Sequence, residues 1–131
     1  MLNKVVFDLG YQPLSNDYLK KSQLDAGEFY LPLKLFLCEK CYLVQIPEYR
    51  SAKETFRSDY AYLSSTSKTL LKFSKKYVDK VIPDLQLDNN SFVIEIASND
   101  GYLLKNFLKY NIPVLGIEPT DLAANLSRKK G

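Results

Sequence analysis

The stretch FVIEIASNDGYLL, residues 92–104, decides the fold that we expect for this chain. Residues 92–97 are a continuous apolar run that only Glu95 interrupts, which is typical of a buried strand in a parallel sheet. The small and polar residues 98–101 predict a tight turn, and residues 102–110 predict a short amphipathic helix. The chain is therefore expected to pass from a buried strand into a helix across one sharp loop.

A second strand and a second helix follow along the chain. Residues 113–117 predict another buried strand, and Thr120 or Asp121 can cap a last helix. A strand–helix–strand–helix order implies a parallel pair of strands joined by a crossover. We therefore expect residues 91–131 to form the start of an α/β domain.

The middle segment, residues 61–90, is predicted to be a linking helix. A hydroxyl side chain supplies its N-cap: Ser64, Ser65 or Thr66. Apolar residues at helical spacing predict the face that packs on a core: Leu70, Phe73, Tyr77 and Val81, with Leu71, Val78 and Ile82 beside them. Pro83 is expected to stop the helix.

Residues 1–60 are rich in Tyr, Phe and Pro and show little helical periodicity. Residues 4–9 predict a short strand that ends at Gly10, and the runs 33–37 and 42–46 predict a hairpin. The expected class is thus α+β to α/β, with a small N-terminal β-hairpin module that is like a zinc knuckle, a linking helix and a truncated α/β start.

Composition excludes several function classes. The chain has 131 residues, a net charge of +3 and no histidine, so it holds no Ser-His-Asp triad, no histidine metal ligand and no histidine base. The small, scattered charge excess argues against nucleic-acid binding. No apolar run approaches 18 residues and no secretory signal is visible, so we expect no membrane partner. Two cysteines without a signal favour a reducing, cytoplasmic location.

The turn after the first core strand is a candidate cofactor site. Small residues let a ligand approach the backbone closely, and Ala97, Ser98 and Gly101 provide them. Glu118 ends the second strand, near the spacing of about 20 residues expected of an acid that binds a ribose.

Glu95 favours a cofactor without phosphate groups. A carboxylate inside the strand would repel a pyrophosphate, and the dinucleotide fingerprint G-x-G-x-x-G is absent apart from Gly101. S-adenosylmethionine carries an ammonium and a ribose but no phosphate, and it suits these acids better. The alternative is that Glu95 and Asp100 only tie down the turn and cap the helix.

A family resemblance extends over nearly the whole chain. Its segments are FVIEIASNDGYLL (92–104), GIEP (116–119), LGYQPLSN (9–16), PL (32–33), CEKC (38–41), VQ (44–45) and DYAYLSSTS (59–67). Together they resemble the class I, S-adenosylmethionine-dependent sugar C-methyltransferases, which act on nucleotide-linked deoxysugars. The resemblance implies a Rossmann-like core and makes Glu118 the ribose acid. It implies that the methionine-binding turn is Glu95, Ala97, Ser98, Asn99, Asp100 and Gly101. It also places Tyr62, Ser64 and Ser65 near the cofactor.

The resemblance also implies what this chain lacks. Such enzymes have about seven core strands and a further C-terminal domain, whereas only two core strands are present here. We therefore expect an N-terminal fragment that supplies part of the cofactor site, has no catalytic residue and is inactive alone. The nucleotide-linked sugar would bind the complete enzyme. The open sheet edge predicts a homo-oligomer, and a non-catalytic zinc-knuckle or interaction module is the alternative function.

Cys38 and Cys41 form a CxxC pair on the predicted hairpin, which is half of a zinc site with four ligands. The family resemblance implies a second pair upstream, which this sequence does not contain. Water, a carboxylate such as Glu39 or a second chain could complete the site. A redox pair is less favoured because the cysteines do not begin a helix. A reduced, metal-free knuckle is the state that we expect.

Overall fold

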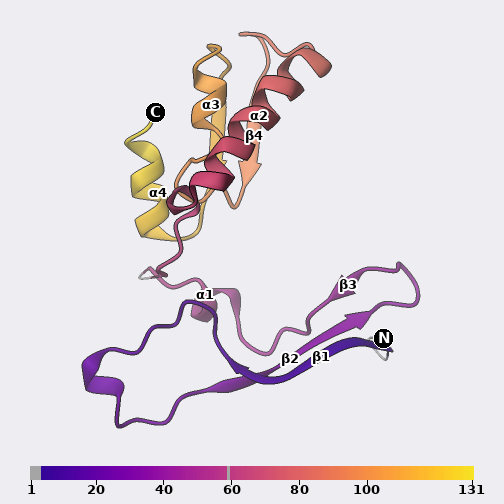
Figure 1. Ribbon diagram of the computed structural model, residues 1–131, viewed down its shortest axis with the longest axis vertical. Helices are drawn as coiled ribbons and strands as arrows, with labels where there is room; N and C mark the ends of the chain where they lie inside the picture. Colours follow the sequence, from indigo (N-terminus) through magenta and orange to yellow (C-terminus); the bar gives the residue numbers. More distant parts are fainter. Residues whose placement is uncertain (1–3, 59) are drawn as a thin grey trace. The chain divides into compact units, whose positions relative to one another are not determined.

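The computed structural model describes residues 4–58 and 60–131, which divide into two compact units, residues 1–55 and 56–131 (Figure 1). Asp59, the first residue of the DYAYLSSTS segment, lies outside the described residues. The first unit contains an antiparallel sheet in the order β1–β2–β3. Its strands are β1 (Lys4–Pro13), β2 (Tyr30–Leu37) and β3 (Val44–Gln45).

Strand β1 is longer than the sequence predicted, because it does not end at Gly10. It pairs with β2 from Lys4 opposite Leu37 to Pro13 opposite Tyr30, with a register shift between Asp8 and Tyr11. Gly10 lies in that shift with a φ of 72°, and its N–H donates to Asp8 Oδ1 at 2.8 Å. The glycine makes a bulge that lets the strand continue.

The predicted hairpin around the two cysteines is confirmed, with a shorter second strand than expected. Strand β2 ends at Leu37, and β3 pairs Val44 with Leu37 and Gln45 with Phe36. Two short helices complete the unit: η1 (Lys21–Gln23) and α1 (Ala52–Thr55). Ser51 and Glu54 form a capping box at the start of α1, since each side chain accepts from the backbone N–H of the other.

The second unit begins with η2 (Ser64–Thr66) and the long helix α2 (Lys68–Asp84). The predicted cap was wrong, because Ser67 caps α2 by accepting from the N–H of Leu70 at 3.2 Å. Pro83 does not stop the helix but lies in its last turn. Its missing N–H and ring are tolerated there because the helix ends one residue later.

The buried face of α2 agrees with the predicted stripe only in part. The residues most buried on this helix are Ser74 and Val78, whereas Phe73 and Tyr77 are exposed and stack with ring centroids 6.5 Å apart. Ser74 is suited to a packed face because its hydroxyl donates to Leu70 O within the helix at 2.8 Å. The predicted helix is confirmed and Val78 is part of the predicted stripe, but the exposed Phe73 and Tyr77 show that the buried face is centred about one residue away.

The rest of this unit is a parallel pair of strands with two helices. The elements are β4 (Val93–Ile96), α3 (Lys105–Leu108), β5 (Val114–Ile117) and α4 (Asp121–Arg128). Strands β4 and β5 pair in parallel, so the predicted strand–helix–strand–helix order is present, with shorter elements than expected. The hydrophobic core joins α2, α3 and the chain before β5: Val78, Leu104, Phe107 and Ile112.

The two faces of the β4–β5 sheet are unequal. Val93 and Val114 pack against the core, but Ile94 and Ile96 on the opposite face are 55% and 80% exposed. The expectation of strands buried on both faces was therefore wrong for residues 92–97. A two-stranded sheet that packs on one face only leaves the other face open. Within residues 4–58 and 60–131, no helix has the length and apolar character needed to cross a membrane.

Candidate cofactor site and metal ligands

In the loop between β4 and α3, every second residue has a positive φ angle. Ala97, Asn99 and Gly101 have φ angles of 60°, 50° and 73°. This left-handed conformation suits glycine, but it costs a residue with a Cβ roughly 1–2 kcal/mol. Three of the loop's backbone N–H groups are bonded within the unit: Ser98 to Ile117 O, Asn99 to Glu118 Oε2 and Gly101 to Ser98 O. The predicted methionine-binding turn is thus an unusual and tightly defined loop.

Glu118 is fixed at the end of the neighbouring strand. Its Oε2 accepts from the N–H of Asn99 at 2.9 Å, and its Oε1 accepts from the N–H and the hydroxyl of Thr120 at 2.8 and 2.5 Å. The carboxylate therefore joins the carboxyl ends of β4 and β5. The structure brings together the loop and the acid that the sequence selected.

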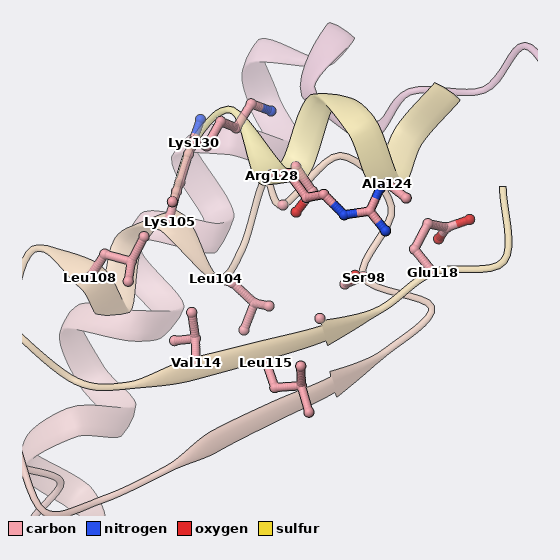
Figure 2. Close-up of a pocket in the computed structure, with 14 residues that line it drawn as sticks. Ser98, Leu104, Lys105, Leu108, Val114, Leu115, Glu118, Ala124, Arg128 and Lys130 are labelled. Carbon is pink, nitrogen blue, oxygen red and sulfur yellow. The ribbon is translucent and has the colours of Figure 1, made fainter. Parts of the chain in front are cut away.

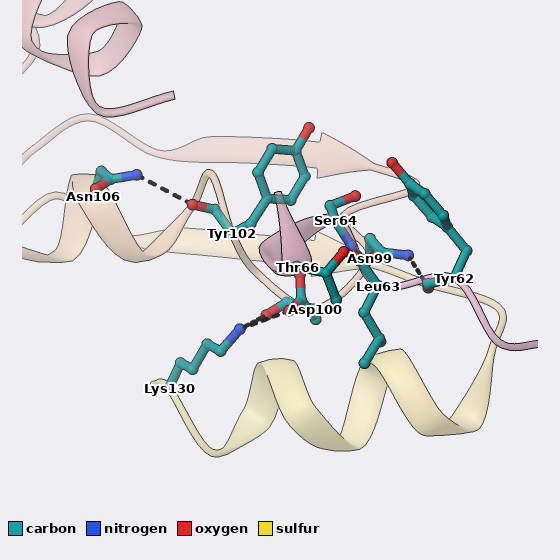
Figure 3. Close-up of polar contacts among 9 residues, drawn as sticks. All are labelled: Tyr62, Leu63, Ser64, Thr66, Asn99, Asp100, Tyr102, Asn106 and Lys130. Carbon is teal, nitrogen blue, oxygen red and sulfur yellow. Dashed lines mark hydrogen bonds and ion pairs between the residues drawn. The ribbon is translucent and has the colours of Figure 1, made fainter. Parts of the chain in front are cut away.

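The side chain of Asn99 ties the segment before α2 to this loop (Figure 3). Asn99 Oδ1 accepts from the N–H of Ser64 at 2.7 Å, and Asn99 Nδ2 donates to Tyr62 O at 3.2 Å. Tyr62 and Ser64, which lie 35 or more residues away in sequence, are thereby placed beside the loop. Ser65 also approaches it, since its backbone and hydroxyl interact with the carboxylate of Asp100.

Asp100 is a buried carboxylate with a cationic partner. Its Oδ2 lies 3.0 Å from Lys130 Nζ, which also donates to the Asp100 carbonyl. Burial alone raises the pKa of Asp100, but Ser65 and the Lys130 ammonium together hold that pKa below its usual value. Its Oδ1 has no hydrogen bond of ordinary geometry among the described residues. Asp100 thus anchors the loop to the end of α4 and does not cap a helix.

Glu95 lies on the helix-covered face of β4 and is the least satisfied acid of the site. Its Oε2 is buried and has no hydrogen-bond partner in the described part of the chain. Burial raises the pKa of Glu95 to about 7. Burial and, next, the charge of Glu95 raise the pKa of Tyr102, which places this phenol near the carboxyl. An unpaired buried acid is costly unless a donor or cation meets it.

A cavity of about 390 Å³ opens beside β5, between α3 and α4 (Figure 2). Three of the predicted site residues line it: Ser98, Gly101 and Glu118. The cations Lys105, Arg128 and Lys130 lie along its wall. The other predicted residues lie outside this lining: Tyr62, Ser64, Ser65, Glu95, Ala97, Asn99 and Asp100. The predicted site is therefore a loop-centred cluster that only partly coincides with the cavity.

Sequence reasoning missed three residues of this cluster. Thr120 holds Glu118, Lys130 pairs with Asp100, and Tyr102 lies near Glu95. The sequence indicated Thr120 only as a helix cap. Thr120 does occupy the N-cap position of α4, but its side chain makes no capping hydrogen bond. The sequence carried a signal for Tyr102, which follows the turn directly, but none for Lys130, whose partner lies 30 residues away.

The two cysteines lie at the tip of the β2–β3 hairpin in the first unit. The N–H of Cys38 donates to Leu43 O at 2.9 Å, and the N–H of Tyr42 donates to Cys38 O at 2.7 Å. The backbone amides of Cys41 and Lys40, followed by the Cys41 thiol, lower the pKa of Cys38. No group of three or more metal-binding side chains occurs among the residues that the structure describes. Two thiols provide half of the tetrahedral set that zinc requires.

The match to a family model ends close to the boundary between the two units. Residues 1–56 match a methyltransferase family model whose description is "Putative zinc binding domain". Over 126 residues, or 96% of the chain, the sequence is 25% identical to the C-methyltransferase NovU of Streptomyces niveus. The chain spans 30% of the length of that relative. The predicted resemblance to C-methyltransferases is confirmed at this level: the chain is similar to part of a C-methyltransferase, and residues 1–56 match the family model named above.

Proposed function

We propose that residues 56–131 form the first part of the S-adenosylmethionine site of a class I methyltransferase with a Rossmann-like core. The observation that carries this proposal is the hydrogen bond of 2.9 Å between Asn99 N and Glu118 Oε2. It joins a strained loop and an acid at the carboxyl ends of two adjacent parallel strands. Ligands of open α/β sheets bind at that edge.

Each acid has a role that its surroundings support. Glu118 would accept from the ribose hydroxyls, because a carboxylate is an acceptor with about four lone-pair sites and Oε2 accepts only one of the three hydrogen bonds that Glu118 receives. Glu95 would meet the ammonium group, since its buried Oε2 is unpaired. The backbone from Ala97 to Gly101 would contact the methionine portion. When bound, the cofactor supplies the methyl group.

The substrate and the remaining chemistry belong to a longer protein in this proposal. The relative is named a C-methyltransferase, and this chain covers 30% of it. Removal of a proton from a sugar carbon beside a carbonyl needs a positioned base. We assign no such base here, so residues 1–131 alone are proposed to be inactive. A nucleotide-linked deoxysugar as substrate and a reducing, cytoplasmic location complete the proposal, the latter supported by two free cysteines.

Calorimetric titration of the demethylated cofactor into the complete enzyme tests the proposal. Glu118→Ala and Glu95→Ala should each weaken binding at least tenfold, because each removes a charged contact of roughly 1.5–3 kcal/mol. Glu54→Ala is a matched control, since Glu54 caps α1 in the other unit. Wild-type affinity in both site variants would refute the proposed cofactor site.

A non-catalytic binding module is the second candidate, and the match of residues 1–56 to a zinc-binding domain favours it. That unit exposes many aromatic side chains, among them Tyr18, Phe29 and Tyr42. Tyr and Phe are enriched in protein–protein interfaces. Bound zinc in the complete protein together with no measurable cofactor binding would favour this candidate over the methyltransferase.

A further inference from the structure

We propose that Thr120 is a positioning residue of the cofactor site, which fixes the Glu118 carboxylate so that Oε2 is the oxygen that meets the ribose. The inference rests on the function proposed above and adds to it the residue that orients the ribose acid. Thr120 acts through Glu118 in this inference and does not itself touch the cofactor.

Thr120 fills the hydrogen-bonding capacity of one Glu118 oxygen. Its backbone N–H and its hydroxyl donate to Oε1 at 2.8 and 2.5 Å. Within the described part of the chain, Oε2 accepts from the N–H of Asn99 at 2.9 Å. A carboxylate offers about four lone-pair sites, about two on each oxygen. The site that is left therefore lies on Oε2, so this is the oxygen that can accept from a ligand.

The local sequence Glu118-Pro119-Thr120 explains how one residue supplies both donors to Oε1. Pro119 has no backbone N–H, so the first backbone donor after Glu118 is that of Thr120. The Glu118 side chain folds back over the proline to reach this N–H. The Thr120 hydroxyl belongs to the same residue and meets the same oxygen.

The Thr120 hydroxyl is directed at Glu118 and not at the end of the helix. Thr120 is the N-cap residue of α4, a position where a threonine side chain usually accepts from an N–H of the first turn. Its side chain makes no such bond, although its carbonyl accepts from the N–H of Ala124 at 3.0 Å. The hydroxyl is therefore used to hold the acid.

Burial separates the role of Thr120 from that of Glu118. Thr120 is 2% exposed, whereas Glu118 is half-buried and lines the cavity beside β5 (Figure 2). A buried residue with a fixed side chain can hold a neighbouring group in one orientation, and precise orientation is what a binding group requires. Glu118 is thus the residue that a ligand can reach, and Thr120 is the support behind it.

Calorimetric titration of the complete enzyme compares Thr120→Val with the wild type. Valine keeps the shape of threonine and the backbone N–H but has no hydroxyl, so Glu118 is held less firmly. Affinity for the demethylated cofactor should fall about fivefold or more, because a hydrogen bond to a charged group is lost. The same titration uses two analogues that each lack one ribose hydroxyl. For at least one analogue the loss should shrink below about twofold, because the orientation of Glu118 no longer matters without the hydroxyl that it accepts.

Three further variants make the test specific. Thr120→Ala also lacks the hydroxyl and should reproduce the result of Thr120→Val. Thr120→Ser keeps the hydroxyl and should stay within about twofold of the wild type. Thr55→Val is the matched control, because it removes a hydroxyl that donates to Ser51 O at 3.1 Å in the other unit, and it should leave every affinity unchanged. Urea denaturation would establish that each variant is folded.

The outcomes distinguish the inference from the function on which it rests. Equal losses for the cofactor and both analogues would overturn the inference, because a merely structural threonine would have that effect. Unchanged affinity in Thr120→Val while Glu118→Ala still weakens binding would also overturn it and would leave the proposed function in place. Wild-type affinity in Glu118→Ala would instead refute the ribose acid and, with it, the role of Thr120.

Discussion

At the scale of single residues, Glu95 should make stability depend on pH in the direction opposite to most carboxylates. Burial raises its pKa from the ordinary 4.5 to about 7, so the folded chain holds this proton more tightly than the unfolded chain. The contribution to the free energy of unfolding is therefore full below pH 4.5 and is lost as pH rises to about 7. Above that pH the folded state carries the whole penalty of a buried charge.

Glu95→Gln should therefore stabilise the free chain at pH 8. The full shift corresponds to about 3 kcal/mol, and partial exposure reduces the expected gain to roughly 1–2 kcal/mol. Urea denaturation at pH 8 and at pH 4.5 measures the difference, which should shrink to a few tenths of a kcal/mol at the lower pH. If Glu95→Gln lowers stability at pH 8, or raises it equally at pH 8 and pH 4.5, Glu95 is not buried as the structure shows.

Ala97 tests whether the loop stores backbone strain. With a φ of 60°, Ala97 adopts a conformation that glycine adopts freely, so Ala97→Gly should raise the free energy of unfolding by up to about 1 kcal/mol. The same substitution at Ala124, inside α4, should lower it by about 1 kcal/mol. A higher free energy of unfolding for Ala97→Gly and a lower one for Ala124→Gly would confirm the left-handed conformation of Ala97. A lower free energy of unfolding in both variants would refute it.

At the scale of elements, the sequence predicted the order and type of most helices and strands, because periodicity reports local structure. The predicted buried face of α2 included Val78, which is buried, but it also included Phe73 and Tyr77, which are exposed, and it left out the buried Ser74. Hydrophobicity alone could not identify Ser74, whose hydroxyl is satisfied within the helix. The bulge at Gly10 was missed for a related reason, since a glycine ends a strand or bends it depending on a partner strand about 20 residues away.

Only part of the candidate site could be predicted, because sequence patterns report local structure and not contacts between distant segments. Glu118 and the loop followed from local spacing along β4 and β5, whereas the contact between Asn99 and the segment at residues 62–64 depends on tertiary folding. Family resemblance, and not spacing, indicated that Tyr62 and Ser64 lie near the loop. Lys130 had no local signal at all, because its partner is fixed only when α4 packs against the loop.

Asn99 should connect two elements that are remote in sequence. Asn99→Gly keeps the left-handed backbone at φ 50° but removes the bonds to Ser64 N and Tyr62 O. We expect a loss of about 1–2 kcal/mol in the free energy of unfolding and faster hydrogen exchange at the Ser64 amide. Asn90→Gly, in an exposed turn before β4, is the control. Unchanged exchange at Ser64 would show that the connection is not maintained in solution.

Lys130 should hold the end of α4 to the loop. Lys130→Met leaves the Asp100 carboxylate buried without its cation, and we expect a loss of roughly 1–3 kcal/mol at pH 7. Because the pKa of Asp100 is lowered on folding, its stabilisation exists above the ordinary value of 3.8 and is lost as pH falls below it. The difference in the free energy of unfolding between Lys130→Met and the wild type should therefore become smaller at acidic pH.

The neighbouring exposed lysine provides the control for that experiment. Lys129→Met removes the same charge one residue away, and it should change stability by no more than about 0.5 kcal/mol at any pH. Equal effects of the two substitutions, measured by denaturation at pH 7 and pH 3, would exclude a specific pair between Lys130 and Asp100.

At the scale of the whole molecule, the open face of the β4–β5 sheet should govern association. Ile94, Ile96, Leu115 and Ile117 are all 46–80% exposed, and they alternate with the residues that face the helices. A contiguous apolar surface of this kind binds hydrophobic dyes and other protein surfaces. We therefore expect the 131-residue chain to associate at this face even when a chelator removes all metal.

Ile96→Lys should separate this association from the stability of the fold. Ile96 is 80% exposed, so a charge there should lower dye fluorescence and the average mass in sedimentation without reducing the free energy of unfolding by more than about 0.5 kcal/mol. Ile112→Lys, at a position that is 1% exposed, should instead unfold the second unit. If the wild-type chain is monomeric in chelator and binds no dye, the face is covered in solution, and the one-sided sheet is not the state that the chain adopts.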